Sequence, residues 1–287
     1  MPDSFTTRRI RVEAILGQGT FDGTHNTRIL EGLETAVSIE KPGLPDKATA
    51  TVRIANMAYD DMAQLTMLAF KPLKLQKNLL RVFAGEEGQE LALAFAGEIV
   101  SAWADFSRFP TATMHMEAQA GGYAALMARG PVAAAGEVPA ADLLQQFATE
   151  MGYTFKNEGV TASVRNAVFS GSPLEKARAV ADQIGAQLLV DDNSLVLMQA
   201  GAVRQGNAVL LTPETGMLGY PSFTNEGISI TCLYNPNLEL GGAVQVQSIV
   251  PGATGTWKIT KLTHDLLANA LFPGPWQSTI EASPYGN

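Results

Sequence analysis

The chain has 287 residues, of which 46% are hydrophobic and 17% charged, and its formal net charge is −8. That length can hold two or three domains. The small charged share, against roughly 25% in ordinary chains, indicates either a surface buried between subunits or one rich in Thr, Gln, Asn and Ala. Because nucleic acid is bound through Lys and Arg and the sequence has no basic run, the composition argues against a stable DNA or RNA complex.

Residues 1–120 alternate between apolar and polar positions over short runs, which is typical of strands with two unlike faces. Between two of these runs, residues 57–70 repeat apolar side chains at helical spacing, with Asp60 and Asp61 where carboxylates suit the helix dipole. This part therefore predicts an antiparallel β-barrel or sandwich with one inserted helix. The runs predicted as strands are 10–16, 29–40, 48–55, 78–84, 91–103 and 111–120.

Residues 121–138 are rich in Ala, Gly and Pro and show no period, so we interpret them as a linker. Residues 139–200 are different, because two helices each end at a glycine that a strand follows. They predict a small α+β domain. One helix runs from Pro139 to Gly152, and the other begins at the capping box Ser172-Pro173-Leu174-Glu175 and ends at Gly185. The strands are 153–155, 187–190 and 195–198, and the last two are expected to pair across Asp191-Asp192-Asn193-Ser194.

Residues 201–287 contain four more runs with period-two alternation, separated by turn residues. They predict a second small antiparallel barrel. The runs are 228–234, 244–247, 257–262 and 276–282, and the breakers are Asn235-Pro236-Asn237, Gly241-Gly242, Pro251-Gly252 and Pro273-Gly274-Pro275. Trp257 and Trp276 each open a run, and we expect both to anchor the barrel core or its seam with the N-terminal barrel.

An ordered series of segments in this part carries a resemblance. The series is LLTPETGMLGYPSF, LYNPNL, a Gly-Gly turn, VQVQS, GTWKITKLTHDL and GPWQSTIEA. It resembles the C-terminal barrel of baseplate hub proteins of contractile-tailed phages, which are related in fold to the hub part of type VI secretion spike proteins. The resemblance covers most of residues 140–287, and it covers the N-terminal third by domain order.

The resemblance implies a mainly β fold, with two tail-tube-like antiparallel barrels flanking the small α+β domain. The implied domains are 1–120, 139–200 and 201–287, with 121–138 as the linker. It further implies a homotrimer that joins the six-fold tail tube to the three-fold spike and forms part of the DNA channel. The expected partners are the tail tube protein and spike or other baseplate proteins, with DNA passing through without specific binding. The expected location is the virion, after assembly in the host bacterial cytoplasm.

The search for reactive residues finds no convergent set. The three histidines, His25, His115 and His264, fall on different predicted elements, and no GxSxG or Cys–His spacing is present. Gly17-Gln18-Gly19 follows a strand, but no helix pattern opens after it, so a hairpin loop fits better than a dinucleotide site. We therefore predict no catalytic residue, no metal and no cofactor.

Paired carboxylates leave one enzymatic alternative open. Asp60-Asp61, Glu86-Glu87 and Asp191-Asp192 could serve glycoside hydrolysis only across a sugar cleft, and adjacent pairs in turns more often face solvent. The alternative functions are a tail-associated cell-wall-degrading enzyme and a carbohydrate-binding β module.

Three further expectations concern the environment of the chain. The single cysteine, Cys232, excludes internal disulfides and is expected to be a buried, inert thiol. The first residues lack the apolar stretch of a signal peptide. No run of about 18 apolar residues is present, so we expect no membrane span.

Overall fold

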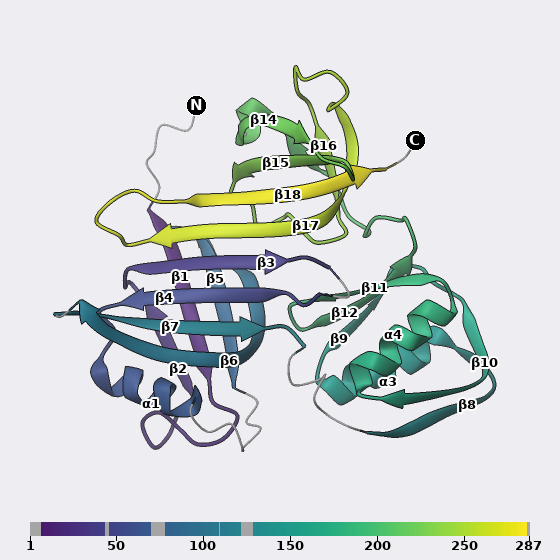
Figure 1. The fold of residues 1–287 in the computed structure, drawn as a ribbon, viewed down its shortest axis with the longest axis horizontal. Coiled ribbons are helices and arrows are strands. Elements are labelled where there is room, and N and C mark those ends of the chain that lie inside the picture. Colours follow the sequence, from purple (N-terminus) through teal and green to yellow (C-terminus); the bar gives the residue numbers. More distant parts are fainter. Residues whose placement is uncertain (1–6, 44–45, 70–77, 109, 122–128, 286–287) are drawn as a thin grey trace.

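The structure is a computed structural model that describes residues 7–43, 46–69, 78–108, 110–121 and 129–285. Most of the strands belong to one large sheet, which occupies the left and top of Figure 1. Its strands are β1 (Arg8–Ile15), β2 (Thr27–Glu31), β3 (Thr35–Lys41), β4 (Thr49–Ala55), β5 (Leu79–Glu86), β6 (Ala92–Arg108), β7 (Thr111–Gln119), β13 (Val209–Leu211), β14 (Met217–Phe223), β15 (Ile228–Leu233), β16 (Ala243–Val246), β17 (Gly255–Ala268) and β18 (Trp276–Pro284). Helix α1 (Tyr59–Ala69) lies beside β6, and the short η1 (Pro213–Thr215) precedes β14.

The large sheet has 13 strands, and it joins the first and last parts of the chain. β17 pairs antiparallel with β3, so that His264 lies opposite Ile39. The path from β14 to β2 is open, because no pairing among the described residues joins its two ends. The predicted pair of closed barrels is therefore replaced by one open sheet that is antiparallel except where β13 pairs with β16. The physical reason is that β17 continues six residues beyond the predicted end at residue 262, and those residues supply most of its pairing with β3.

Alternation in these strands produces one buried and one accessible face. In β3, for example, Val37 and Ile39 are buried, whereas Ser38 and Glu40 are exposed. The buried faces of β3 and β4 pack against those of β1 and β5, which cross behind them in Figure 1. A smaller cluster, which includes Trp257, fills the space among the C-terminal strands.

Residues 129–199 form an α+β part, at the lower right of Figure 1, which begins ten residues before the domain predicted at 139–200. Its elements are β8 (Arg129–Pro139), α3 (Ala140–Met151), β9 (Thr154–Asn157), β10 (Ser163–Gly171), α4 (Pro173–Gln183), β11 (Ala186–Asp191) and β12 (Ser194–Gln199). β8 pairs with β10, and β12 lies between β11 and β9. The capping box at Ser172 and Glu175 is confirmed, and Gly152 ends α3 in the left-handed conformation that glycine favours.

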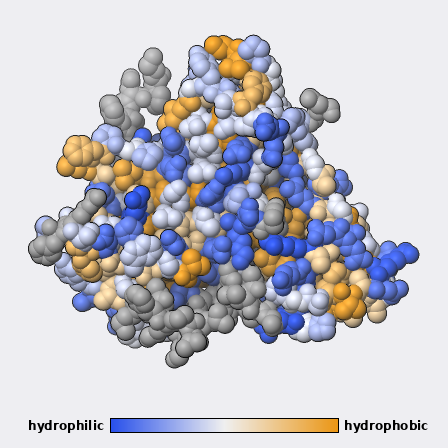
Figure 2. Space-filling view, viewed as in Figure 1, coloured by the Kyte–Doolittle hydropathy of each residue, from blue (hydrophilic) through white to orange (hydrophobic). Residues whose placement is uncertain are grey.

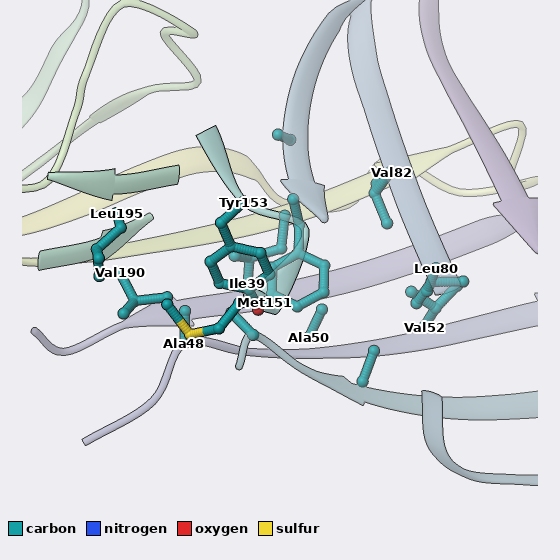
Figure 3. Packing of buried hydrophobic residues seen from close by; sticks show 14 of the residues in the cluster. Ile39, Ala48, Ala50, Val52, Leu80, Val82, Met151, Tyr153, Val190 and Leu195 are labelled. Carbon is teal, nitrogen blue, oxygen red and sulfur yellow. The ribbon is translucent and has the colours of Figure 1, made fainter. Parts of the chain in front are cut away.

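The core of the sheet continues into this α+β part. Figure 3 shows Ala48, which precedes β4, and Ala50 of β4 near Met151 and Tyr153 of the α+β part, and all four belong to one buried cluster. The two parts are therefore packed on each other through apolar side chains, in addition to the polar contacts described below.

Two sequence predictions differ from the structure at the level of single elements. The predicted linker 121–138 contains strand β8 from residue 129 onward, while residues 122–128 lie outside the described part. The alternation there is masked by small residues, because Ala and Gly carry little hydrophobic contrast. The single predicted strand 29–40 is two strands, β2 and β3, because Gly32 turns the chain with a φ of 79°.

Candidate functional site

Six neighbouring strands of the large sheet present one continuous accessible surface. In order they are β15, β18, β17, β3, β4 and β7, and Figure 1 shows most of them as adjacent bands across the front of the molecule. We call this surface the polar face. The residues that form it are Ser229, Thr231, Leu233, Gln277, Thr279, Glu281, Lys261, Thr263, Asp265, Leu267, Ala36, Ser38, Glu40, Thr49, Thr51, Arg53, Thr113, His115, Glu117 and Gln119.

The polar face consists mainly of short uncharged side chains. Registered rows run across it, and one row places Thr231, Thr279, Thr263 and Glu40 side by side. In Figure 2 the middle of this view is mostly blue to pale. The face crosses the β17–β3 junction without interruption, so the first and last parts of the chain contribute to one surface.

The charges on the polar face are few and mostly negative. The polar face has four carboxylates and two basic side chains. The carboxylates are those of Glu40, Glu117, Asp265 and Glu281, and the basic side chains are those of Arg53 and Lys261. The Lys261 ammonium lies 2.6 Å from a Glu40 oxygen and 4.0 Å from one of Glu281. These pairs are exposed and stabilise the fold little. The face as a whole carries an acidic balance.

A buried ionic cluster lies where the sheet meets the α+β part. We call its four residues, Lys41, Asp191, Asp192 and Arg204, the ionic junction. The Lys41 ammonium donates to Asp191 Oδ1 at 2.9 Å and to Asp192 Oδ2 at 3.1 Å. Arg204 Nη1 donates to Asp191 Oδ2 at 2.7 Å and to the carbonyl of Leu240 at 3.2 Å. Because these residues come from β3, the β11–β12 turn and the segment after β12, the cluster ties three parts of the chain together.

The ionic junction perturbs the acidity of its members. Burial favours the neutral form of Asp191, but Lys41 and Arg204 outweigh it and lower the pKa of Asp191 to about 2. Burial and the neighbouring Asp191 charge raise the pKa of Asp192, against the effect of Lys41. Burial would lower the pKa of Lys41, but the two carboxylates outweigh it and raise that pKa.

Sequence reasoning placed Asp191 and Asp192 in a turn, which is confirmed, but expected such pairs to face solvent. That interpretation is wrong here because Lys41 and Arg204 approach from distant segments and compensate the buried charges. One signal was available in the sequence. Lys41 has the same strand parity as the buried Val37 and Ile39, and a lysine at a buried position requires a partner.

An aromatic seam lies next to the ionic junction. His264 is buried, and its Nδ1 lies 2.8 Å from the Ser278 hydroxyl. The Tyr234 ring meets the rings of His264 and Trp276 edge-on, at centroid distances of 5.2 and 5.4 Å. The Arg8 guanidinium lies 5.6 Å from the Trp276 ring centroid. Strands from both ends of the chain therefore meet around Trp276.

Stability at acid pH is expected to depend on His264. Burial, helped by the positive charge of Lys41, lowers the pKa of His264 to about 3, from about 6.5 in the unfolded chain. As the pH falls, His264 therefore takes up a proton in the unfolded chain before it does so in the folded one. The contribution of the neutral His264 to the unfolding free energy is complete above pH 6.5 and is lost as the pH falls toward 3. Between pH 7 and pH 4.5 the loss is about 2–3 kcal/mol.

The control for this prediction is the variant His264→Gln, measured by urea unfolding at both pH values. Asp192, with its raised pKa, changes stability in the opposite direction over the acid range, and it is present in both proteins. The wild type should therefore lose more unfolding free energy on acidification than the variant does. Equal losses in the two proteins would show that His264 is not held neutral by burial.

The remaining candidate residues do not come together. His25 lies in the β1–β2 loop, where its Nδ1 is 2.8 Å from Asp22 Oδ2, and His115 stacks on Trp103 of β6. The Gly17-Gln18-Gly19 segment is confirmed as a hairpin loop, because β1 and β2 pair antiparallel around it. Asp61, from the Asp60-Asp61 pair, accepts hydrogen bonds from the Arg28 side chain and does not form a common site with the other candidate residues.

The described part of the chain contains neither a group of side chains that could hold a metal ion nor a helix that could span a membrane. No group of three or more His, Cys, Asp or Glu side chains there is arranged to hold a metal ion. Among the helices in the described ranges, none is long and apolar enough to cross a membrane. Cys232 is buried as expected, and burial raises the pKa of its thiol to about 11, which leaves it unreactive.

Solved structures with a similar fold come from phage tails and from type VI secretion. The 43 kDa tail protein of prophage MuSo2 from Shewanella oneidensis is 10% identical, with a TM-score of 0.63 and 96% of both chains covered. A tail protein from Neisseria meningitidis MC58 is 10% identical, with a TM-score of 0.64 and the same coverage. An E. coli type VI secretion component, described as similar to the T4 tail proteins gp27 and gp5, is 10% identical at a TM-score of 0.58, with 88% of this chain and 74% of that chain covered.

Comparison with curated proteins finds no match. At the level of protein families, a model described as baseplate hub gp41 matches residues 10–270. That match spans nearly all of the large sheet and the whole α+β part. The chain therefore belongs to the baseplate hub gp41 family.

Proposed function

We propose that this chain is the structural hub of a phage tail tip or baseplate, with the polar face forming part of the wall of the DNA channel. The observation that carries the proposal is the continuity of this face across six strands from both ends of the chain. Membership of the baseplate hub family supports a structural role in the tail, and with it a place in the virion. Assembly would take place in the host bacterial cytoplasm.

The acidic balance of the polar face suits a passage for DNA. Phosphates are held by Lys and Arg, and this face has two such side chains, of which Lys261 is already paired with carboxylates. Its hydroxyl and amide side chains offer no fixed positive charge. DNA would therefore slide past the face instead of binding to it.

We further propose that three copies of the chain surround the channel. Each copy supplies two groups of strands, β1–β7 and β13–β18, joined at the β17–β3 pairing. Three chains would then present six strand groups to the six-fold tail tube and three equivalent surfaces to the spike. The partners would be the tail tube protein above and spike or other baseplate proteins below. In this arrangement residues 139–200 form a separate domain between the two strand groups, which correspond to 1–120 and 201–287.

The proposed role is not enzymatic. The paired carboxylates lie in different places, and those of Asp191 and Asp192 are engaged in the ionic junction. The alternative of a cell-wall-degrading enzyme would require a free acid and base across a cleft. We expect the purified protein to leave peptidoglycan suspensions turbid.

The copy number in the assembled tail tests the proposal. An electron-microscopy map of the tail tip should contain three copies of this chain at the level between tube and spike. A map that contains six copies, or one, would contradict the proposed symmetry change.

A further inference from the structure

Lys258 is a buried lysine with an unusual set of partners. It lies on β17, opposite Ala243 of β16 and Ser283 of β18, and only 7% of its surface is exposed. Its ammonium donates to the side-chain oxygen of Gln187 on β11 at 2.6 Å. An ammonium group has three N–H donors, so this one neutral acceptor satisfies a single donor.

Two of the other buried cations have carboxylate partners, whereas Lys176 of α4 donates to the carbonyl oxygen of Gly130 at 2.6 Å. Lys41 and Arg204 both bind Asp191, and Lys41 also binds Asp192. For Lys258, no carboxylate of the described residues lies within ion-pair distance. Burial alone accounts for the lowered pKa of Lys258. A charge held in this way is costly unless something else pairs with it.

A cavity of about 540 Å³ opens beside this lysine, between the C-terminal strands and β11. Gly241 and Pro42 help to form its walls, together with the stem of Lys258. Lys261 also lines the cavity, but Glu40 and Glu281 already pair with it. Asp46 and Glu226 also line the cavity, and because both residues are exposed, water reduces the repulsion that a single negative charge would meet there.

We propose that this cavity is a binding site for a single carboxylate group, which pairs with the Lys258 ammonium beside Gln187. A carboxylate accepts several N–H donors at once and would satisfy the donors that Gln187 leaves free. The carboxylates of Asp46, Glu226 and Glu281 surround the opening and disfavour anions of higher charge. A monoanion is therefore favoured over the phosphate dianion or a nucleic acid.

Two sources can supply such a group, namely a free small carboxylate or an Asp or Glu side chain of a neighbouring protein. The experiment uses the full chain in thermal unfolding, so it does not depend on the proposed hub function. The probes are sodium acetate, the peptide Ac-Gly-Glu-Gly-NH2, its Gln counterpart, and inorganic phosphate, all at pH 8, where phosphate is mainly a dianion, and against sodium chloride at matched ionic strength. The variants are Lys258→Met, with Lys258→Gln as a second form, and Lys156→Met on the exposed side of β9 as the matched control.

At probe concentrations well above the dissociation constant, the wild type and Lys156→Met should unfold about 2–4 °C higher, and both Lys258 variants should not respond. A response to acetate and to the Glu peptide assigns a free carboxylate as a sufficient ligand. A response to the Glu peptide alone, with none to its Gln counterpart, assigns a protein side chain. Equal responses in the Lys258 variants, no response in the wild type, or an equal response to phosphate would each overturn the proposal.

Discussion

The variant Asp191→Asn is expected to lose about 3–5 kcal/mol of unfolding free energy at pH 7, because it breaks a buried ion pair from one side. Asp191 lies between Lys41 and Arg204, at 2.9 and 2.7 Å. The substitution removes the negative charge and places an amide N–H₂ where one of the two cations now donates. It leaves Lys41 with the carboxylate of Asp192, whose pKa is already raised, and Arg204 with that of Glu239, whose side chain is about half exposed. Urea unfolding of both proteins measures the difference.

The matched control is an ion pair of similar length on the surface. Arg165 Nη2 lies 2.6 Å from Glu137 Oε2, between β10 and β8, and both side chains are more than half exposed. Because water and salt screen such a pair, Glu137→Gln should change the unfolding free energy by at most about 1 kcal/mol. If Asp191→Asn had an effect as small as the control, the ionic junction would not hold the sheet and the α+β part together.

Truncation of the Trp276 side chain is expected to have an effect of similar size, also about 3–5 kcal/mol. The residue is 7% exposed and belongs to the main buried cluster, where it meets Tyr234 and lies under Arg8. The sequence-based expectation that it anchors the seam between the first and last parts of the chain is confirmed. Since a domain usually has about 5–15 kcal/mol of stability, Trp276→Ala should yield misfolded or insoluble protein.

Phe272 provides the control for this change, because it lies in the loop between β17 and β18 and is 75% exposed. Phe272→Ala should alter the unfolding free energy by no more than about 0.5 kcal/mol. The opposite outcome is also informative. A folded Trp276→Ala protein with an unchanged melting temperature would favour the alternative of an exposed, carbohydrate-binding tryptophan.

The elements of this fold could be predicted from the sequence because each depends on a local pattern. Alternation located most strands of the large sheet, and the capping box at Ser172 located the start of α4. Strand β10 was not predicted, because two register shifts, one of them at Asn166 with a φ of 45°, interrupt its alternation. The partner of each strand is a different matter. The pairing of β17 with β3 joins residues more than 200 positions apart, and no local period contains that information.

The ionic junction could be predicted only in part, for the same reason. The alternation along β3 places Lys41 on the buried face, where its charge needs a partner. The two carboxylates that serve as partners lie about 150 positions away in the sequence. Arg204 follows β12 in a segment without period, and its approach to Asp191 depends on the folded position of the Leu240 carbonyl. The sequence therefore predicts that a buried charge needs a partner, and only the folded structure identifies which residue that partner is.

The polar face is proposed to line the channel of the hub. A reconstruction of the assembled baseplate at side-chain resolution tests it most directly, through the direction in which Ser38, Thr51 and Thr263 point. These residues from three copies should face the axis of the channel, with the buried face of the same strands directed away from it. A map in which this face packs against another protein, or lies on the outside of the ring, would contradict the account.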